Sequence, residues 1–444
     1  MKKLVLIMLI AVLALATVLG GCSGAAAGGG SSAKTDNKQL SLSLSPDGYG
    51  DVWVDLISMF QQKYPDIEIA ADIEQGCSSR LQPSIIAGNP PDLVYANSNE
   101  YDIHGGIFAD QFQDVEYILN DKIEGTDKTY ADLFKPSVID ACTFNNNVML
   151  IPMSGATAVT FFDKKLLRDS GITPPKSYEE MMALGQQLAD KGVALYGYNG
   201  MYPGYVLNSL IGLSVYAYGG SKAYDDSFFI ASKDGWHSDA VKRALQDFKG
   251  LCDSGYLLKG STALDHTQMQ MELLNRKVAF IPSGSWFESE MSGSVPDDFE
   301  IGFMPVPTKS ADSKEFIGAY LVGMGVPAKA KNPENAKKFV HFFYSEEAQQ
   351  IAAAYGIEPP VKNLNVEVLS NFTPSIQEIN SYIAQDQVVL VDLKYYQLYP
   401  TLLQVLSDNV NLLALGEITI DEFCNEAEDE AERLRSDPDV LKIK

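Results

Sequence analysis

The chain of 444 residues carries 58 acidic and 34 basic side chains, which gives a net charge of −24 at pH 7. So large an acidic excess argues against nucleic acid or an anionic membrane surface as a partner, because both require clustered lysine and arginine. At about 150 residues per domain the length allows two or three domains, and we expect two lobes.

The N-terminus has the pattern of an export signal. A basic start, Met1 to Lys3, precedes an apolar stretch at residues 4–19 that is short for a membrane span. The run Leu19-Gly20-Gly21-Cys22 resembles a bacterial lipobox. This resemblance implies a cleaved signal peptide at 1–21 and a lipid-modified Cys22. An ordinary secretory signal with a chance cysteine is the alternative.

Residues 22–38 are rich in glycine, alanine and serine. Such a sequence cannot bury enough apolar surface to fold, so we expect a flexible tether behind the lipidated cysteine. Together, signal and tether predict a protein anchored on the extracytoplasmic face of the bacterial cell membrane.

The next segments alternate between strand and helix patterns. We expect strands near Leu40 to Leu44, Ile67 to Ile73 and Asp92 to Tyr95, separated by helices near residues 53–63 and 80–87. Strand, helix, strand, helix, strand implies parallel pairing, with ligand sites beyond the carboxyl ends of the strands.

A second α/β unit follows Met153. We expect strands at Val159 to Phe162, 278–281, 299–303 and 316–326. Helix starts are predicted where capping residues precede apolar periodic stretches: Ser177, Asn332-Pro333, Ser345 and Thr419.

The remaining cysteines and the histidines lack the spacing of a metal site. Cys77, Cys142, Cys252 and Cys424 are widely dispersed, as are the four histidines. We favour small buried thiols over disulfide bridges, and we expect neither a metal nor a cofactor.

Six short motifs, by their order and spacing, resemble the carbohydrate-binding family of extracellular solute-binding proteins of ABC transporters, the maltose-binding-protein-like group. They are Phe60 to Ile67, Ile86 to Asp92, Phe161 to Leu166, Gly171 to Ser177, Ser283 to Trp286 and Asn332 to Phe339. Phe162-Asp163 departs from the Tyr or Asn usual after that strand. A narrower similarity, carried by residues 276–291, is to binding proteins for N-acetylglucosamine and its disaccharide.

This resemblance implies an α/β fold of the two-lobe periplasmic-binding-protein-like type II, with discontinuous lobes joined by a hinge. We expect one lobe at residues 39–153 plus 305–344 and the other at 154–304 plus 345–444. It also implies a monomer that captures a carbohydrate between the lobes and delivers it to ABC permease subunits.

A sugar site needs a flat aromatic platform for C–H groups and fixed polar groups for hydroxyls. The resemblance places the stacking tryptophan at Trp286, and the Gly-Pro-rich loop offers Tyr202 or Tyr205. Trp53 and Tyr395 are further candidates, although both also fit a core, and Tyr396 and Tyr399 are alternatives to Tyr395.

For the sugar hydroxyls we expect polar side chains at strand ends and beside Trp286. These are Asn97, Asn99, Asp265, Gln268 and Glu288.

We predict a binding protein rather than an enzyme. The chain contains no G-x-S-x-G elbow and no phosphate-binding loop, and Ser407-Asp408-Asn409 imitates a β-lactamase element without its partners. A glycosidase is the enzymatic alternative, since it also combines aromatic platforms with carboxylates. A tethered sugar sensor for a receptor kinase or chemoreceptor is the other alternative.

Overall fold

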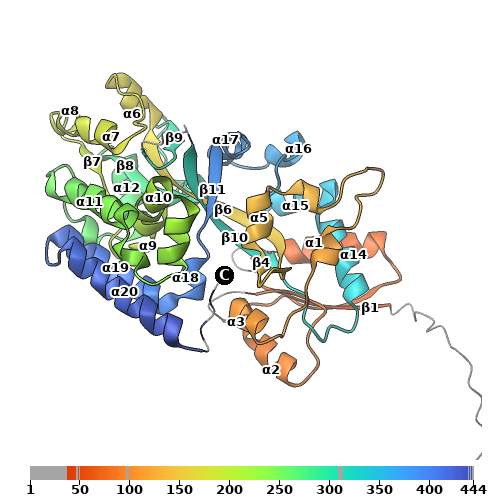
Figure 1. Ribbon diagram of the computed structural model, residues 1–444. Helices are drawn as coiled ribbons and strands as arrows, with labels where there is room; N and C mark the ends of the chain where they lie inside the picture. The colour runs from red at the N-terminus through yellow and green to blue at the C-terminus, as the bar shows by residue number, and fades with distance from the viewer. Residues whose placement is uncertain are drawn as a thin grey trace, which may run out of the picture. The chain divides into compact units, whose positions relative to one another are not determined.

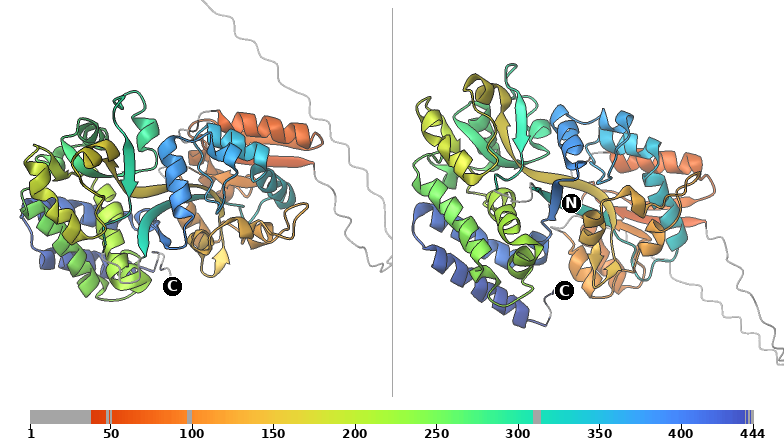
Figure 2. Two further views of the ribbon diagram at one scale, coloured as in Figure 1. Left: turned by 90° about the horizontal axis from the view of Figure 1, so that it is seen from above. Right: turned by 45° about the horizontal axis from the view of Figure 1, so that its top comes forward.

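The computed structural model describes residues 38–46, 49, 51–96, 100–308, 314–438, 440 and 442. Figure 1 shows its helices and strands, and Figure 2 gives two further views. The strands are β1 (Gln39–Leu44), β2 (Glu68–Asp72), β3 (Leu93–Tyr95), β4 (Thr143–Phe144), β5 (Asn147–Val148), β6 (Ile151–Asp163), β7 (Ala194–Tyr196), β8 (Val278–Gly284), β9 (Ile301–Met304), β10 (Glu315–Met324) and β11 (Val388–Asp392).

The helices vary from single turns to five turns. Those up to residue 189 are α1 (Val52–Lys63), α2 (Leu81–Ile86), α3 (Ile103–Phe108), α4 (Glu116–Leu119), α5 (Pro136–Ala141), α6 (Lys164–Asp169), α7 (Tyr178–Ala183) and α8 (Gly185–Ala189). The later ones are α9 (Gly204–Val206), α10 (Gly212–Phe228), α11 (Asp239–Asp253), α12 (His266–Leu274), α13 (Phe287–Glu290), α14 (Pro333–Phe343), α15 (Glu346–Ala354), α16 (Val366–Leu369), α17 (Pro374–Ile383), α18 (Tyr395–Leu398), α19 (Pro400–Leu415) and α20 (Ile420–Ser436).

The first sheet has the order β2-β1-β3, and both pairings are parallel, as the alternating pattern predicts. An apolar stripe on α1, which includes Leu56 and Phe60, packs into a first core with Phe339 and Phe343 of α14. Capping is also close to expectation, because Ser345 accepts from Ala348 N and Thr419 forms a capping box with Glu422.

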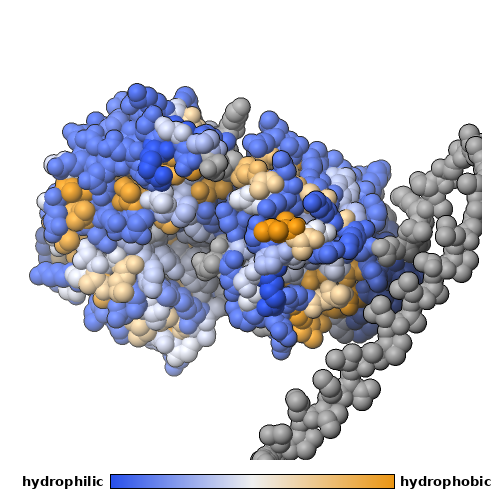
Figure 3. Space-filling view, turned by 90° about the horizontal axis from the view of Figure 1, so that it is seen from below, coloured by the Kyte–Doolittle hydropathy of each residue, from blue (hydrophilic) through white to orange (hydrophobic). Residues whose placement is uncertain are grey.

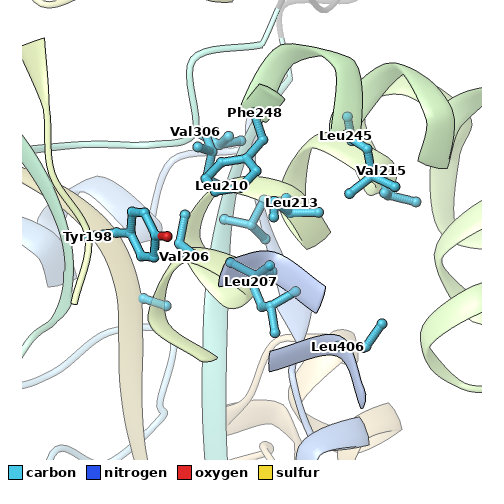
Figure 4. Close-up of a cluster of buried hydrophobic side chains, with 14 of the residues drawn as sticks. Tyr198, Val206, Leu207, Leu210, Leu213, Val215, Leu245, Phe248, Val306 and Leu406 are labelled. Atoms are coloured by element: carbon cyan, nitrogen blue, oxygen red, sulfur yellow. The ribbon is translucent and has the colours of Figure 1, made fainter. Parts of the chain in front are cut away.

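The second sheet has the order β11-β10-β6-β8-β7, with β9 also paired to β6. Successive residues of β6 alternate between its faces: Phe162 packs into a second core, while Val159 and Phe161 pack into a third. Figure 4 shows part of the second core, where Leu207 and Leu210 lie near Phe248 and Leu406.

Two long strands join the cores. The antiparallel pair β6 and β10 sends Met153 and Met324 into the first core, and Ala158 and Phe316 into the second. We call the elements around the first core the first lobe and those around the other two the second lobe, with β6 and β10 as the hinge strands.

One boundary differs from the sequence prediction. Ala348 and Ala352 of α15, and Ile357 after it, belong to the first core, although residues 345–444 were assigned to the second lobe. An amphipathic helix buries its apolar stripe against whichever core is adjacent, and the stripe itself does not say which.

The four described cysteines, Cys77, Cys142, Cys252 and Cys424, are unpaired thiols, and three of them are buried. Burial raises the pKa of the Cys142 thiol to about 12, so this group stays protonated and unreactive at neutral pH. The surface seen in Figure 3 is mostly hydrophilic, with small separate apolar patches.

Candidate functional site

A pocket of about 470 Å³ opens in the second lobe. Its lining comes from the loop after β7, the end of β8, the hinge strand β10, and helices α18 and α19. The lining residues are Gly200, Met201, Tyr202, Pro203, Gly204, Tyr205, Asn208, Trp286, Tyr320, Tyr396, Leu403, Gln404, Ser407, Asp408 and Asn411.

Glycines allow the aromatic side chains to reach this pocket. A Cβ on Gly200 would lie 2.3 Å from the Thr262 Cα, so only glycine fits where the loop crosses that segment. A Cβ on Gly284 would lie 2.1 Å from the Trp286 ring. The indole therefore lies against the strand that precedes it, and it remains partly exposed.

Five aromatic side chains form one wall of the pocket. Trp286 meets Tyr205 edge to face with ring centroids 6.0 Å apart, and Tyr320 at 5.8 Å. Tyr320 in turn contacts Tyr396 at 5.6 Å. Tyr202 is half exposed at the rim, where its edge meets the His266 ring at 5.6 Å. Such a wall offers ring faces to C–H groups and hydroxyls at its edges.

The hydroxyls of Tyr205, Tyr320 and Tyr396 on this wall stay uncharged. Burial raises the pKa of Tyr205 and of Tyr396 to about 12, and it also raises the pKa of Tyr320. The Asn208 amide donates to the Tyr320 hydroxyl at 2.9 Å and accepts from the Tyr395 hydroxyl at 2.6 Å. These bonds fix the orientation of Tyr320 toward the pocket.

A polar face of α19 forms another part of the pocket lining. Gln404, Ser407, Asp408 and Asn411 follow the helical repeat of three and four residues, so they lie on one side of the helix. Gln404 donates to Asp408 Oδ1 at 3.0 Å, and Asn411 donates to the Gly200 carbonyl at 2.8 Å. This face presents amides, a hydroxyl and one carboxylate.

A second pocket, of about 430 Å³, shares Tyr396 and Leu403 with the first. It brings in Tyr95, Ala96, Asp102 and His104 from the first lobe. Burial lowers the pKa of His104 to about 4, so its imidazole is neutral at physiological pH. The two pockets together form a cleft with walls from both lobes.

Three predicted residues come together in this cleft: Trp286, Tyr202 and Tyr205 line its first pocket. Trp286 also lies just after the buried strand β8, as its selection from the sequence assumed.

Three predicted polar residues have other partners and line neither pocket. Asp265 and Gln268 form the capping box of α12, with Gln268 N donating to Asp265 Oδ1 at 2.7 Å. Glu288 accepts from Ser375 N at 2.8 Å at the start of α17. Their sequence positions reflect helix termini, which favour the same polar residue types as binding sites do.

Two predicted aromatic residues are core residues, and this corrects their assignment to the cleft. Trp53 is 1% exposed and donates from its indole nitrogen to the Ser45 carbonyl at 2.7 Å. Tyr395 is fully buried in the second core, so its neighbour Tyr396 lines the pocket instead. Asn97, Asn99 and Cys22 lie outside the described residues.

Several lining residues were not predicted from the sequence. Tyr320 lies on the strand expected at 316–326, and Ser407-Asp408 belongs to the run that imitates a β-lactamase element. The one available signal was the polar spacing Gln404, Asp408, Asn411 along an otherwise apolar helix.

A comparison with known families decides the identity of the chain. Residues 46–350 match the family of bacterial extracellular solute-binding proteins. The chain belongs to this family. Members of the family are binding proteins, and this agrees with the prediction that the chain is not an enzyme.

A curated relative of this solute-binding protein is the diacetylchitobiose-binding protein NgcE of Streptomyces coelicolor. The two are 26% identical over 325 residues, which cover 70% of this chain and 67% of NgcE.

Solved structures share its fold. The apo-form of RafE from Streptococcus pneumoniae is 16% identical, with a TM-score of 0.71, over 89% of this chain and 97% of RafE. A chitin oligosaccharide binding protein is 19% identical, with a TM-score of 0.68, over 89% and 99%. These likenesses confirm the predicted two-lobe type II α/β fold.

None of the described helices is both long and apolar enough to cross a membrane. In the same part of the chain, no three histidine, cysteine, aspartate or glutamate side chains are grouped as metal ligands.

Proposed function

We propose that this solute-binding protein captures a neutral carbohydrate in the cleft formed by the two pockets. The observation that carries the proposal is the pairing of an aromatic wall, centred on Trp286, with the amide and hydroxyl face of α19. A pyranose presents C–H groups on one face and hydroxyls on its rim, so it matches both sets of groups at once.

The charges that line the cleft favour an uncharged ligand. Among the described residues of both pockets there is no lysine or arginine, whereas Asp408 and Asp102 are present. A uronic acid or a sugar phosphate would place its negative charge beside these carboxylates without a cationic partner. The names of NgcE and of the chitin oligosaccharide binding protein direct the choice of ligand toward N-acetylglucosamine oligosaccharides.

The proposed mechanism is closure around the hinge strands β6 and β10. A ligand stacked on Trp286 and bound to α19 gains the first-lobe contacts near Tyr95 and His104 only when the lobes meet, so it shifts the population toward the closed form. Micromolar capture requires about 8 kcal/mol of net binding free energy.

Calorimetry with a panel of sugars tests this function. The panel should hold N,N′-diacetylchitobiose, longer chitin oligosaccharides, raffinose, maltose, and a uronic acid disaccharide as the charged control. Saturable binding of a neutral sugar supports the proposal. Binding of the uronate alone, or of no sugar while a different class of solute binds, would overturn it.

We further propose that the protein is lipid-anchored through Cys22 and delivers its ligand to an ABC permease. The lipobox-like run Leu19 to Cys22 and the tether behind it support the anchor. We expect metabolic labelling with a fatty acid to mark the wild-type protein in expressing cells, and Cys22→Ser to lose the label. An unlabelled wild-type protein, or a variant that keeps the label, would show that Cys22 is not the anchor.

Genetic context separates transport from sensing. Permease genes beside this gene favour delivery to a transporter, and a lone receptor kinase or chemoreceptor gene favours the sensor alternative.

A further inference from the structure

A small crevice of about 40 Å³ lies beside the hinge strand β6, outside both pockets of the cleft. Its walls are largely apolar and include Pro359, Pro360, Ile379, Ile383 and Leu390. The crevice is too small for a sugar, yet the half-buried Glu358 is one of its lining residues. A carboxyl group in such surroundings costs free energy unless a hydrogen bond or an ion pair compensates for it.

Glu358 is attached to the first lobe and to the hinge strand. Its neighbour Ile357 is fully buried in the first core. Its carbonyl accepts from Gly155 N at 2.7 Å, at the segment of β6 that pairs with β10 on its other side. The backbone of Glu358 is therefore attached both to the first lobe and to the hinge strand.

The side chain of Glu358 reaches the residue before Trp286. Ser285 is fully buried and donates from its hydroxyl to Glu358 Oε1 at 2.9 Å. The same hydroxyl accepts from Thr157 N at 3.3 Å, and Ser285 N donates to the Thr157 carbonyl at 3.0 Å. Ser285 is thus bound on both sides, and Trp286 follows it directly at the start of α13.

We propose that Glu358 is a positioning residue for Trp286, which ties the tryptophan through Ser285 to the hinge strand and to the first lobe. Because the bond joins two lobes, the charge of this carboxyl group affects the position of the platform. The proposal adds a regulatory residue to the proposed function, but it concerns the protein without ligand.

The environment of Glu358 makes its charge pH-sensitive. Burial raises the pKa of Glu358 to about 8, against the smaller lowering effect of the Ser285 hydroxyl. Lys135 and Lys362 are the other ionisable residues lining the crevice. The Lys135 ammonium donates to the Ile383 carbonyl, Lys362 is exposed, and neither forms an ion pair with Glu358 among the described contacts.

Below pH 8 the neutral acid suits the largely apolar crevice. Above it, the ionised carboxylate draws water into the crevice and loosens the contact between the first lobe and Ser285. Trp286, beside Ser285, then changes its surroundings.

Tryptophan fluorescence of the ligand-free protein tests this proposal. The difference between the wild-type protein and Trp286→Phe, recorded from pH 6 to 9.5, isolates the signal of Trp286 from those of Trp53 and Trp236. We expect this difference to titrate with a midpoint near pH 8 in the wild-type protein. The corresponding difference between Glu358→Gln and the double variant Glu358→Gln, Trp286→Phe should not change with pH.

Two further variants test whether the charge of Glu358 affects Trp286 through Ser285. Ser285→Ala removes the connecting hydroxyl and should also abolish the response. Glu288→Gln removes a negative charge two residues from Trp286 and should preserve the midpoint, because Glu288 is bound to α17 instead. Circular dichroism at pH 6 checks that each variant is folded.

The proposal is overturned if the wild-type difference signal does not titrate, or if Glu358→Gln titrates with the same midpoint. Neither outcome depends on a sugar. Failure to bind N,N′-diacetylchitobiose or any other sugar would overturn the proposed function without affecting this result.

Discussion

At the scale of single residues, we expect Trp286 to contribute most to the free energy of ligand binding. It is the centre of the aromatic wall, since it contacts both Tyr205 and Tyr320. We expect Trp286→Ala to weaken binding of the captured sugar by about 30-fold, which corresponds to about 2 kcal/mol. Calorimetry gives the dissociation constants of both proteins.

Tyr117→Ala is the matched control for that loss. Tyr117 is a partly exposed aromatic residue of α4 that lines neither pocket. Its substitution should leave the affinity unchanged. Equal affinity of Trp286→Ala and the wild-type protein would remove Trp286 from the site.

Asp163 is a buried carboxylate that joins separate segments of the second lobe. It is fully buried at the end of β6, where Arg276 Nε donates to its Oδ2 at 2.7 Å. Its Oδ1 accepts from Lys165 N at 2.9 Å and from Glu300 N at 3.2 Å. The carboxylate therefore caps α6 and links three segments.

We expect Asp163→Ala to lower the free energy of unfolding by about 3 kcal/mol, because it removes a helix cap and leaves Arg276 without its buried partner. Urea denaturation measures the change. Asp169→Ala, at an exposed ion pair with Lys165 on the same helix, should have little effect. Similar small effects of both substitutions would contradict the structural role of Asp163.

At the scale of secondary-structure elements, local signals predicted what local physics determines. The parallel pairing of β1, β2 and β3 was predictable because strand and helix patterns alternate along this part of the sequence. The caps at Ser345 and Thr419 were predictable because their side chains form hydrogen bonds within one helical turn. The lobe to which α15 belongs depends on packing between distant segments, so the amphipathic pattern of the helix could not identify that lobe.

The residues of the candidate site also divide into those that local sequence signals identify and those that depend on tertiary packing. Trp286 was recognisable because Ser283, Gly284 and Ser285 before it are small. Tyr320 was not, since only the pairing of β10 with β6 places it beside Asn208 and Trp286. Asp265 was wrongly expected in the site because helix caps and hydroxyl-binding positions favour the same polar residue types.

The crevice beside β6 also predicts how stability varies with pH. The native protein keeps the proton of Glu358 up to about pH 8, whereas the unfolded chain releases it near pH 4.3. Between these values the unfolded state binds fewer protons than the native state, so this residue lowers stability as pH rises, by up to about 1.4 kcal/mol per pH unit.

Glu358→Gln removes this dependence while its side-chain oxygen can still accept from Ser285. We therefore expect the variant to gain stability relative to the wild-type protein from pH 5 to pH 8, with a constant difference above pH 8. Urea denaturation midpoints at pH 5, 6.5, 8 and 9 check this. A difference that does not grow with pH would show that Glu358 is ionised in the native protein.

At the scale of the whole molecule, the proposed mechanism couples ligand binding to closure of the two lobes through the hinge strands. β6 and β10 contribute side chains to the cores of both lobes, so bending them need not disrupt either core. The cleft places Trp286 and α19 on the second lobe, and Tyr95 and His104 on the first. A ligand that contacts both sets stabilises the closed arrangement.

Small-angle X-ray scattering of the mature chain measures that closure. We expect the radius of gyration to fall when a sugar that binds by calorimetry is added to saturation, because contacts with the first lobe form only after hinge bending. A sugar that gives no binding heat is the control and should leave the scattering unchanged. If the binding sugar saturates the protein without compaction, capture occurs on the second lobe alone, and the pocket near Tyr95 and His104 plays no part in it.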